Sequence, residues 1–230
     1  MKRVHKIRRM IAAGIVVVGV GVALWTNPDF HQPIAVESSD ANPEGQAAEV
    51  LQALPVKGRA PKTDYSREQF GKGWAEVNGC DMRNIILHRD LQDTAINERC
   101  QVTSGMLRDP YTNKDITFIR GADTSDDIQI DHVVALSDAW QKGAQQLSFE
   151  RREQLANDPL ELIAVDGPMN QQKGDGDAAT WLPPNKPFRC QYVARQIAVK
   201  KKYDLWVTQA EKDAMERVLA ICPGQTLPSA

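Results

Sequence analysis

The stretch Asp131-His132-Val133-Val134-Ala135-Leu136 places a carboxylate and an imidazole side by side near the middle of the chain. About forty residues later, Asn170-Gln171-Gln172-Lys173-Gly174-Asp175 adds an amide and an ammonium group. A histidine that acts as a base, together with oxygen ligands for a cation, is what metal-assisted cleavage of a phosphodiester requires. The two stretches therefore predict the chemistry of a nuclease.

The chain has 230 residues, of which 42% are hydrophobic and 25% charged, enough for one globular domain with tails. A basic start followed by the apolar run Met10–Trp25 predicts a signal peptide or an uncleaved membrane anchor over residues 1–25. Residues 26–63 are expected to form a flexible linker, 64–223 the folded domain and 224–230 a loose tail. The domain is thus expected to be secreted, or anchored on the extracellular side of a bacterial membrane.

Four cysteines lie in the expected domain, and their even number is typical of disulfides in an oxidising compartment. Pairing Cys80 with Cys100 and Cys190 with Cys222 is favoured because each bond closes a local loop of moderate length. Structural zinc is the alternative, but the chain has no Cys-x-x-Cys pair to support it.

Alternating apolar residues predict half-buried strands around Ile116 to Phe118 and Ile128 to Ile130, which places His132 at the end of a strand. Leu160 to Val165 predicts another strand, and Asn170 follows it near the start of a helix. Residues 148–157 predict a polar helix, whereas 84–91 fit either a helix or a short strand. This α+β arrangement brings His132 and Asn170 close together.

Three stretches, 131–136, 157–162 and 170–175, resemble in their order an HNH nuclease of the ββα-metal (His-Me finger) type. More closely, the chain resembles the C-terminal domain of GmrSD-type restriction endonucleases as found in small secreted bacterial proteins. The resemblance covers about Tyr65 to Cys222 and extends to Cys80-Asp81-Met82-Arg83, Arg89-Asp90-Leu91, Asp109-Pro110-Tyr111, Trp140 with Gly143-Ala144, and 178–184. It implies a ββα-metal core with additional helices.

The resemblance also implies roles for five residues. His132 is the expected general base, while Asp131 and Asn170 are expected to hold one divalent cation, Mg²⁺ or Mn²⁺. Lys173 is expected to hold a phosphate oxygen. Glu161 stands where the family usually has asparagine, and two roles remain open for it: holding a histidine N–H, or adding negative charge near the metal.

The formal net charge is −2, and without the five cations at positions 2–9 it becomes about −7. Contact with nucleic acid, expected to be DNA, must then be local. The cation-rich stretch Lys186–Tyr203 contains no Asp or Glu and predicts a phosphate-binding helix face, for which a solvated face is the alternative. Its proposed nucleic-acid-binding residues are Arg189, Arg195, Lys200 and Lys202.

The sequence thus predicts an exported, metal-dependent endonuclease with little sequence preference and no obligate protein partner, which contacts the membrane only through its N-terminal segment. One alternative is a catalytically silent domain that binds nucleic acid or another polymer at the cell envelope. A second alternative is an extracellular hydrolase of a different phosphodiester.

Overall fold

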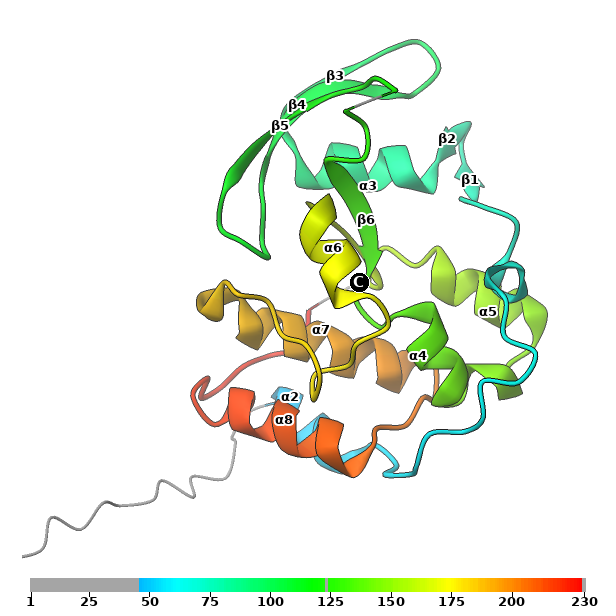
Figure 1. Cartoon of the computed structure of the whole chain (residues 1–230), viewed down its shortest axis with the longest axis vertical. Helices are drawn as coiled ribbons and strands as arrows, with labels where there is room; N and C mark the ends of the chain where they lie inside the picture. The colour runs from blue at the N-terminus through cyan, green and yellow to red at the C-terminus, as the bar shows by residue number, and fades with distance from the viewer. Residues whose placement is uncertain (1–45, 123, 229–230) are drawn as a thin grey trace, which may run out of the picture. The chain divides into compact units, whose positions relative to one another are not determined.

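The structure is a computed structural model that describes residues 46–122 and 124–228. The predicted signal peptide or anchor at 1–25 and the first part of the predicted linker, 26–45, lie outside these residues. None of the helices in the described ranges has the length and apolar character needed to span a bilayer. Figure 1 shows helices gathered at one end of the folded unit and a three-stranded sheet at the other.

A two-stranded antiparallel ladder carries the Asp-His pair. Strand β6 (Ile128–His132) pairs with β7 (Leu162–Asp166), with His132 opposite Leu162. Helix α6 (Gly167–Lys173) follows β7 directly, because Asp166 caps it by accepting a 2.8 Å hydrogen bond from the Met169 N–H. The strands predicted on either side of the long connection, and the helix that contains Asn170, are therefore confirmed.

The antiparallel sheet consists of β3 (Gln92–Ile96), β4 (Val102–Arg108) and β5 (Asp115–Ile119). Helix α3 (Met82–Asp90) follows the small hairpin of β1 (Glu76–Val77) and β2 (Cys80–Asp81), and Asp81 caps it. The stretch 84–91 is thus helical up to Asp90. Ile86 and Leu87 of α3 pack with Phe118 and Ile128 in a core that joins the sheet to β6.

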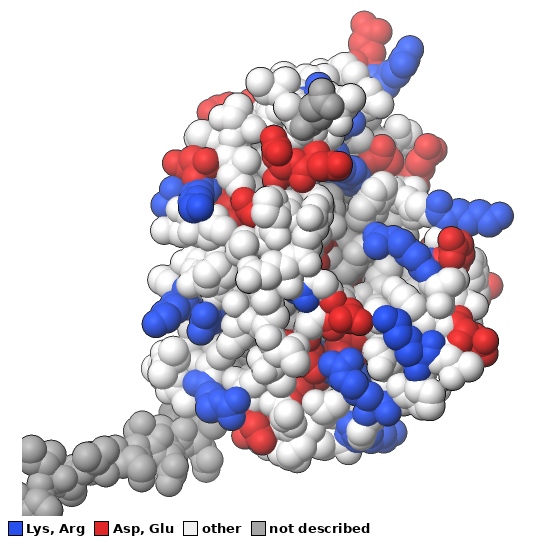
Figure 2. Space-filling view, viewed as in Figure 1, with Lys and Arg blue, Asp and Glu red and all other residues white. Residues whose placement is uncertain are grey.

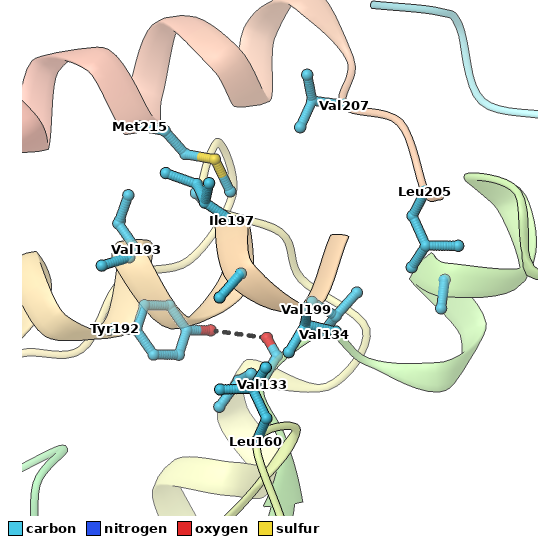
Figure 3. Packing of buried hydrophobic residues seen from close by; sticks show 14 of the residues in the cluster. Val133, Val134, Leu160, Tyr192, Val193, Ile197, Val199, Leu205, Val207 and Met215 are labelled. Carbon is cyan, nitrogen blue, oxygen red and sulfur yellow. Dashed lines mark hydrogen bonds between the residues drawn. The ribbon is translucent and has the colours of Figure 1, made fainter. Parts of the chain in front are cut away.

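The larger core lies among the helices α4 (Leu136–Gln141), α5 (Phe149–Ala156), α7 (Arg189–Lys202) and α8 (Gln209–Leu219). The predicted helix at 148–157 is confirmed as α5, with Ser148 as its N-cap. Figure 3 shows Val193 and Ile197 of α7 between Met215 of α8 and the segment Val133-Val134 that leaves β6. Short 3₁₀ turns at Arg67–Phe70 (η2), Ala144–Gln146 (η3) and Lys186–Phe188 (η4) complete the unit.

The folded domain begins earlier than residue 64. Helix α2 (Gln46–Ala53) buries Ala47, Ala48 and Leu51 in the larger core, so the predicted linker is wrong over residues 46–63. The predicted loose tail is wrong over its described part as well, because the Ala47 N–H donates to the Gln225 carbonyl at 3.0 Å and the Leu227 N–H to the Gln46 side chain at 3.1 Å. Alanine and glutamine carry little apolar signal, yet two small residues on one face let a helix pack closely.

Two disulfides, Cys80–Cys100 and Cys190–Cys222, join the pairs that the loop lengths favoured. The first ties the β1–β2 hairpin to the turn between β3 and β4, and the second ties the start of α7 to the end of α8. All four cysteines are therefore paired, as is typical of proteins that fold in an oxidising compartment.

A network of three cations and three carboxylates, buried except for the exposed Arg59, holds the helical half together. Lys142, which is 0% exposed, lies 2.8 Å from Asp138, 2.7 Å from Asp177 and 2.6 Å from Glu211. Arg59 and Lys200 supply the other two positive charges. Burial lowers the pKa of Lys142, but the carboxylates of Glu211 and Asp138 raise it by more, so that the ammonium stays charged.

We expect Lys142→Ala to lower the free energy of unfolding by about 3–5 kcal/mol, because it leaves a buried carboxylate without its partner. Urea titration followed by circular dichroism measures this loss. Exposed Lys114 provides the matched control, since Lys114→Ala should change stability by no more than about 0.5 kcal/mol. Equal unfolding midpoints for the two variants would contradict the inference that the buried carboxylates depend on Lys142 as their partner.

Candidate functional site

A cavity of about 420 Å³ opens where β6, α6 and the start of α4 meet the segment that contains η2. Its walls include all three residues from which the sequence predicted a cation site and a base: Asp131, His132 and Asn170. The structure therefore brings these residues together, although about forty positions separate them in the chain.

The periodicities of a strand and a helix explain how the residues meet. Gln129 and Asp131, two apart on β6, face the same side of the ladder, and Asn170 and Lys173, three apart on α6, face the same side of the helix. The Asn170 amide donates to Gln129 Oε1 at 2.9 Å, and the Lys173 ammonium donates to Asp131 Oδ1 at 2.8 Å. These two side-chain pairs thus fix the position of α6 against β6.

His132, 7% exposed, alternates to the other side of β6. Its Nε2 lies 2.9 Å from the carbonyl oxygen of Ala156, at the end of α5. A carbonyl only accepts, so we assign the proton of the neutral ring to Nε2, which leaves Nδ1 unprotonated. The indole of Trp74 lies parallel to the imidazole, with 5° between the planes and 5.9 Å between the ring centroids.

Burial, together with the smaller effect of the positive charge of Arg67, lowers the pKa of His132 to about 3, although the hydrogen bond with the Ala156 carbonyl raises it. The ring is therefore neutral at neutral pH. A neutral imidazole with one free nitrogen is able to accept a proton.

Asp131 is held through both of its carboxylate oxygens. Lys173 contacts Oδ1, and the buried hydroxyl of Tyr111 donates to Oδ2. The Lys173 ammonium also donates to the His132 carbonyl at 2.7 Å, and its side chain is 0% exposed. This placement does not fit the predicted contact of Lys173 with a phosphate oxygen, because the buried ammonium is turned inward to satisfy Asp131.

The donor set around the cavity fits a cation that prefers oxygen. Each oxygen of Asp131 accepts one hydrogen bond from the described residues, and a carboxylate oxygen has a second lone pair. Asn170 uses its nitrogen for Gln129, which leaves its Oδ1. Across the residues that the structure describes, no three His, Cys, Asp or Glu side chains cluster as metal ligands, so water and phosphate would have to complete the coordination.

Glu161 is 0% exposed and does not line the cavity. Its carboxylate accepts from the Val134 N–H at 3.2 and 3.3 Å, and its own backbone carbonyl accepts from the Val133 N–H. Burial raises the pKa of Glu161 well above its usual value, although nearby Lys173 lowers it. The carboxylate of Glu161 therefore contacts neither the imidazole of His132 nor the cavity proposed for the metal. It anchors the loop that leaves β6 instead.

The four basic residues predicted to bind nucleic acid lie away from the lining of the cavity. Lys200 is fully buried in the charge network, which excludes it from any external contact. Lys202 pairs with Asp158 at 2.6 Å, Arg195 donates to the Leu162 carbonyl, and Arg189 to the Pro183 carbonyl. Val193 and Ile197 do pack inward, as expected. The prediction that Lys200 binds phosphate is wrong, and the side chains of Arg189, Arg195 and Lys202 already contact protein groups.

Sequence reasoning missed three residues of the site. Tyr111 belongs to the turn-forming motif Asp109-Pro110-Tyr111, and nothing in that motif indicates a bond to Asp131. Arg67 lies in the short 3₁₀ turn η2 and Trp74 in the irregular segment between η2 and β1, and neither stretch is long enough for periodicity to show which way a side chain points. Tertiary contacts alone identify them.

Comparison with known proteins gives two matches. The family described as "GmrSD restriction endonucleases, C-terminal domain" matches residues 81–218, which include every residue of the β6, β7 and α6 unit. An "Uncharacterized secreted protein" of the fungus Arthroderma benhamiae is 37% identical over 179 residues, covering 76% of this chain and 84% of that protein. No solved structure matches the chain.

The family match spans more than half of the chain and includes Asp131, His132 and Asn170, whereas Tyr65, Arg67 and Trp74 of the cavity wall lie before it. The chain therefore belongs to the family of GmrSD restriction endonuclease C-terminal domains.

Proposed function

We propose that this protein is an exported, metal-dependent endonuclease that hydrolyses phosphodiester bonds of DNA. The observation that carries the proposal is the neutral imidazole of His132, whose Nε2 is held by Ala156, in one cavity with Asp131 and Asn170. Family membership supports a nuclease-like activity. The ββα-metal assignment fits the order of β6, β7 and α6 and remains part of the proposal.

His132 Nδ1 accepts a proton from a water molecule, and the water oxygen forms a bond to phosphorus. The phosphorus–oxygen bond to the leaving group then breaks, and the leaving oxygen takes up a proton from solvent. Asp131 and Asn170 would hold a divalent cation, Mg²⁺ or Mn²⁺, which would supply positive charge to stabilise the scissile phosphate and the leaving oxygen. Lys173 and Tyr111 orient the Asp131 carboxylate for that task.

An extracellular location fits both disulfides and the name of the fungal relative, a secreted protein. The bacterial origin expected from the resemblance gains no support from this relative. Anchoring through residues 1–25 remains a proposal.

Low sequence preference follows from the charge distribution. Figure 2 shows Lys and Arg interspersed with Asp and Glu over the viewed face, without a continuous basic surface. Contacts would then be few and made to phosphates, which carry no base sequence.

The silent polymer-binding domain is the second candidate, and one observation favours it: both oxygens of Asp131 are already engaged by protein donors. Such a domain would bind its polymer equally well with and without a divalent cation. Loss of cleavage on removal of His132 separates the two candidates.

We expect the full chain to nick plasmid DNA with Mg²⁺ or Mn²⁺ and to stop when EDTA is added. His132→Ala should lower the rate by about 10²–10⁴-fold, since it removes the general base, and Asn170→Ala should raise the metal concentration needed for half-maximal rate. Gel assays of plasmid conversion measure both effects.

Exposed His88 and Gln171 give the matched controls His88→Ala and Gln171→Ala, which should cleave like the wild type. Cleavage that survives His132→Ala would refute the assignment.

The contacts of Glu161 predict a structural rather than catalytic role. Since its pKa is higher in the folded protein than its usual 4.5, the carboxyl stabilises the fold fully below about pH 4.5 and loses that contribution as the pH rises toward the folded pKa. Glutamine does not titrate. The stability of the wild type relative to Glu161→Gln should therefore fall as the pH rises above about 4.5.

Urea unfolding at several pH values measures this difference, with exposed Glu98→Gln as the control that shows no such trend. A difference that is flat with pH would mean that the carboxyl has the same pKa in both states. Glu161→Gln should also retain DNA cleavage. If Glu161 were a general acid or a metal ligand, this variant would lose cleavage.

A further inference from the structure

The site lacks the phosphate-binding cation that the sequence predicted, because the Lys173 ammonium is buried on Asp131 and the His132 carbonyl. Two other cations, Arg67 and Arg83, line the cavity. Arg83 is committed through one nitrogen only: its Nη2 donates to the carbonyls of Ser125 at 3.0 Å and Ile128 at 3.3 Å, holding the loop before β6, whereas its buried Nη1 has no partner among the described residues.

Arg67 differs from these side chains. Within residues 46–122 and 124–228, no hydrogen bond or ion pair engages its exposed guanidinium. It lines the 420 Å³ cavity and also a smaller one of about 120 Å³ whose walls include His132 and Trp74. Arg67 is therefore an uncommitted positive charge shared by the two hollows that border the proposed base.

The backbone that carries Arg67 is firmly fixed although its side chain is free. In η2, Phe70 is 2% exposed in the larger core, and the Gln69 carbonyl accepts from Arg152 Nε at 2.8 Å. The Ala75 N–H, beyond Trp74, donates to Asn157 Oδ1 at 2.8 Å. A guanidinium on such a support meets a ligand without the cost of ordering a loop.

We propose that Arg67 binds a non-bridging oxygen of the phosphodiester that is cleaved, beside His132. This inference rests on the proposed function. A guanidinium suits the task because its planar fork donates two parallel hydrogen bonds to phosphate, whereas a lysine ammonium acts as a point charge. The cavity lining contains the carboxylates of Asp126, Asp131 and Asp175, so the positive charge of Arg67 lessens the repulsion that a phosphate would meet there.

Kinetics of the full chain on plasmid DNA test the contact. We expect Arg67→Ala to lower kcat/KM by about 10–100-fold and Arg67→Lys to recover only part of the loss. Arg99→Ala is the matched control, since Arg99 is exposed in the β3–β4 turn and does not line the cavity, and its kcat/KM should equal that of the wild type. Unchanged urea midpoints would show that the Arg67 variants fold.

A binding measurement separates a phosphate contact from a structural effect. In the His132→Ala background, which does not cleave, fluorescence anisotropy with a labelled oligonucleotide gives the dependence of affinity on salt. Loss of one phosphate contact in Arg67→Ala should reduce the slope of log K against log salt by about 0.7–0.9, and Arg99→Ala should leave it unchanged.

Suppose that the wild type cleaves DNA and that Arg67→Ala has the same kcat/KM and the same salt slope as its Arg67-containing counterpart. This result would overturn the role of Arg67 and leave the proposed nuclease function intact. A wild type that neither cleaves nor binds DNA would instead overturn the proposed function, and the role of Arg67 with it.

Discussion

The antiparallel register between β6 and β7 is the constraint on which the site depends. Because side chains alternate along a strand, this register turns Asp131 toward α6 and His132 toward α5, each to a partner that fixes it. A slip by one residue would exchange the two faces, burying an apolar residue under Lys173 and separating the imidazole from the Ala156 carbonyl. Glu161, one residue before β7, helps to exclude that slip by holding the loop at Val134.

Buried charge recurs in both halves of the functional region, and in each case it is paired. The ammonium of Lys173 offsets Asp131 beneath the cavity, while Lys142 and its neighbours join α4, α7 and α8. Such pairs add little stability compared with apolar packing, but they tolerate few alternative arrangements. The helices are therefore positioned by electrostatic complementarity as well as by the apolar contacts of Figure 3.

Local patterns predicted the elements that carry the site. Alternation identified β6, the polar stretch 148–157 identified α5, and loop length identified both disulfides. The patterns failed where a residue's role is set by distant partners. Lys200 has the neighbours of a solvated lysine in the sequence, yet Glu211 and Asp138 draw it into the interior. Strands β3 and β4 are rich in Gln, Thr and Ser, so no apolar alternation marks them before the sheet forms.

The contacts between the first described helix and the last described residues have an architectural consequence. Gln46 meets Leu227, so the polypeptide enters and leaves this folded unit at neighbouring points. A module of that kind can be inserted into a surface loop of another protein, or permuted, without stretching its backbone. Adjacent ends of this kind would let the host's two flanking strands of chain meet at neighbouring points, so the fold of either partner need not be strained.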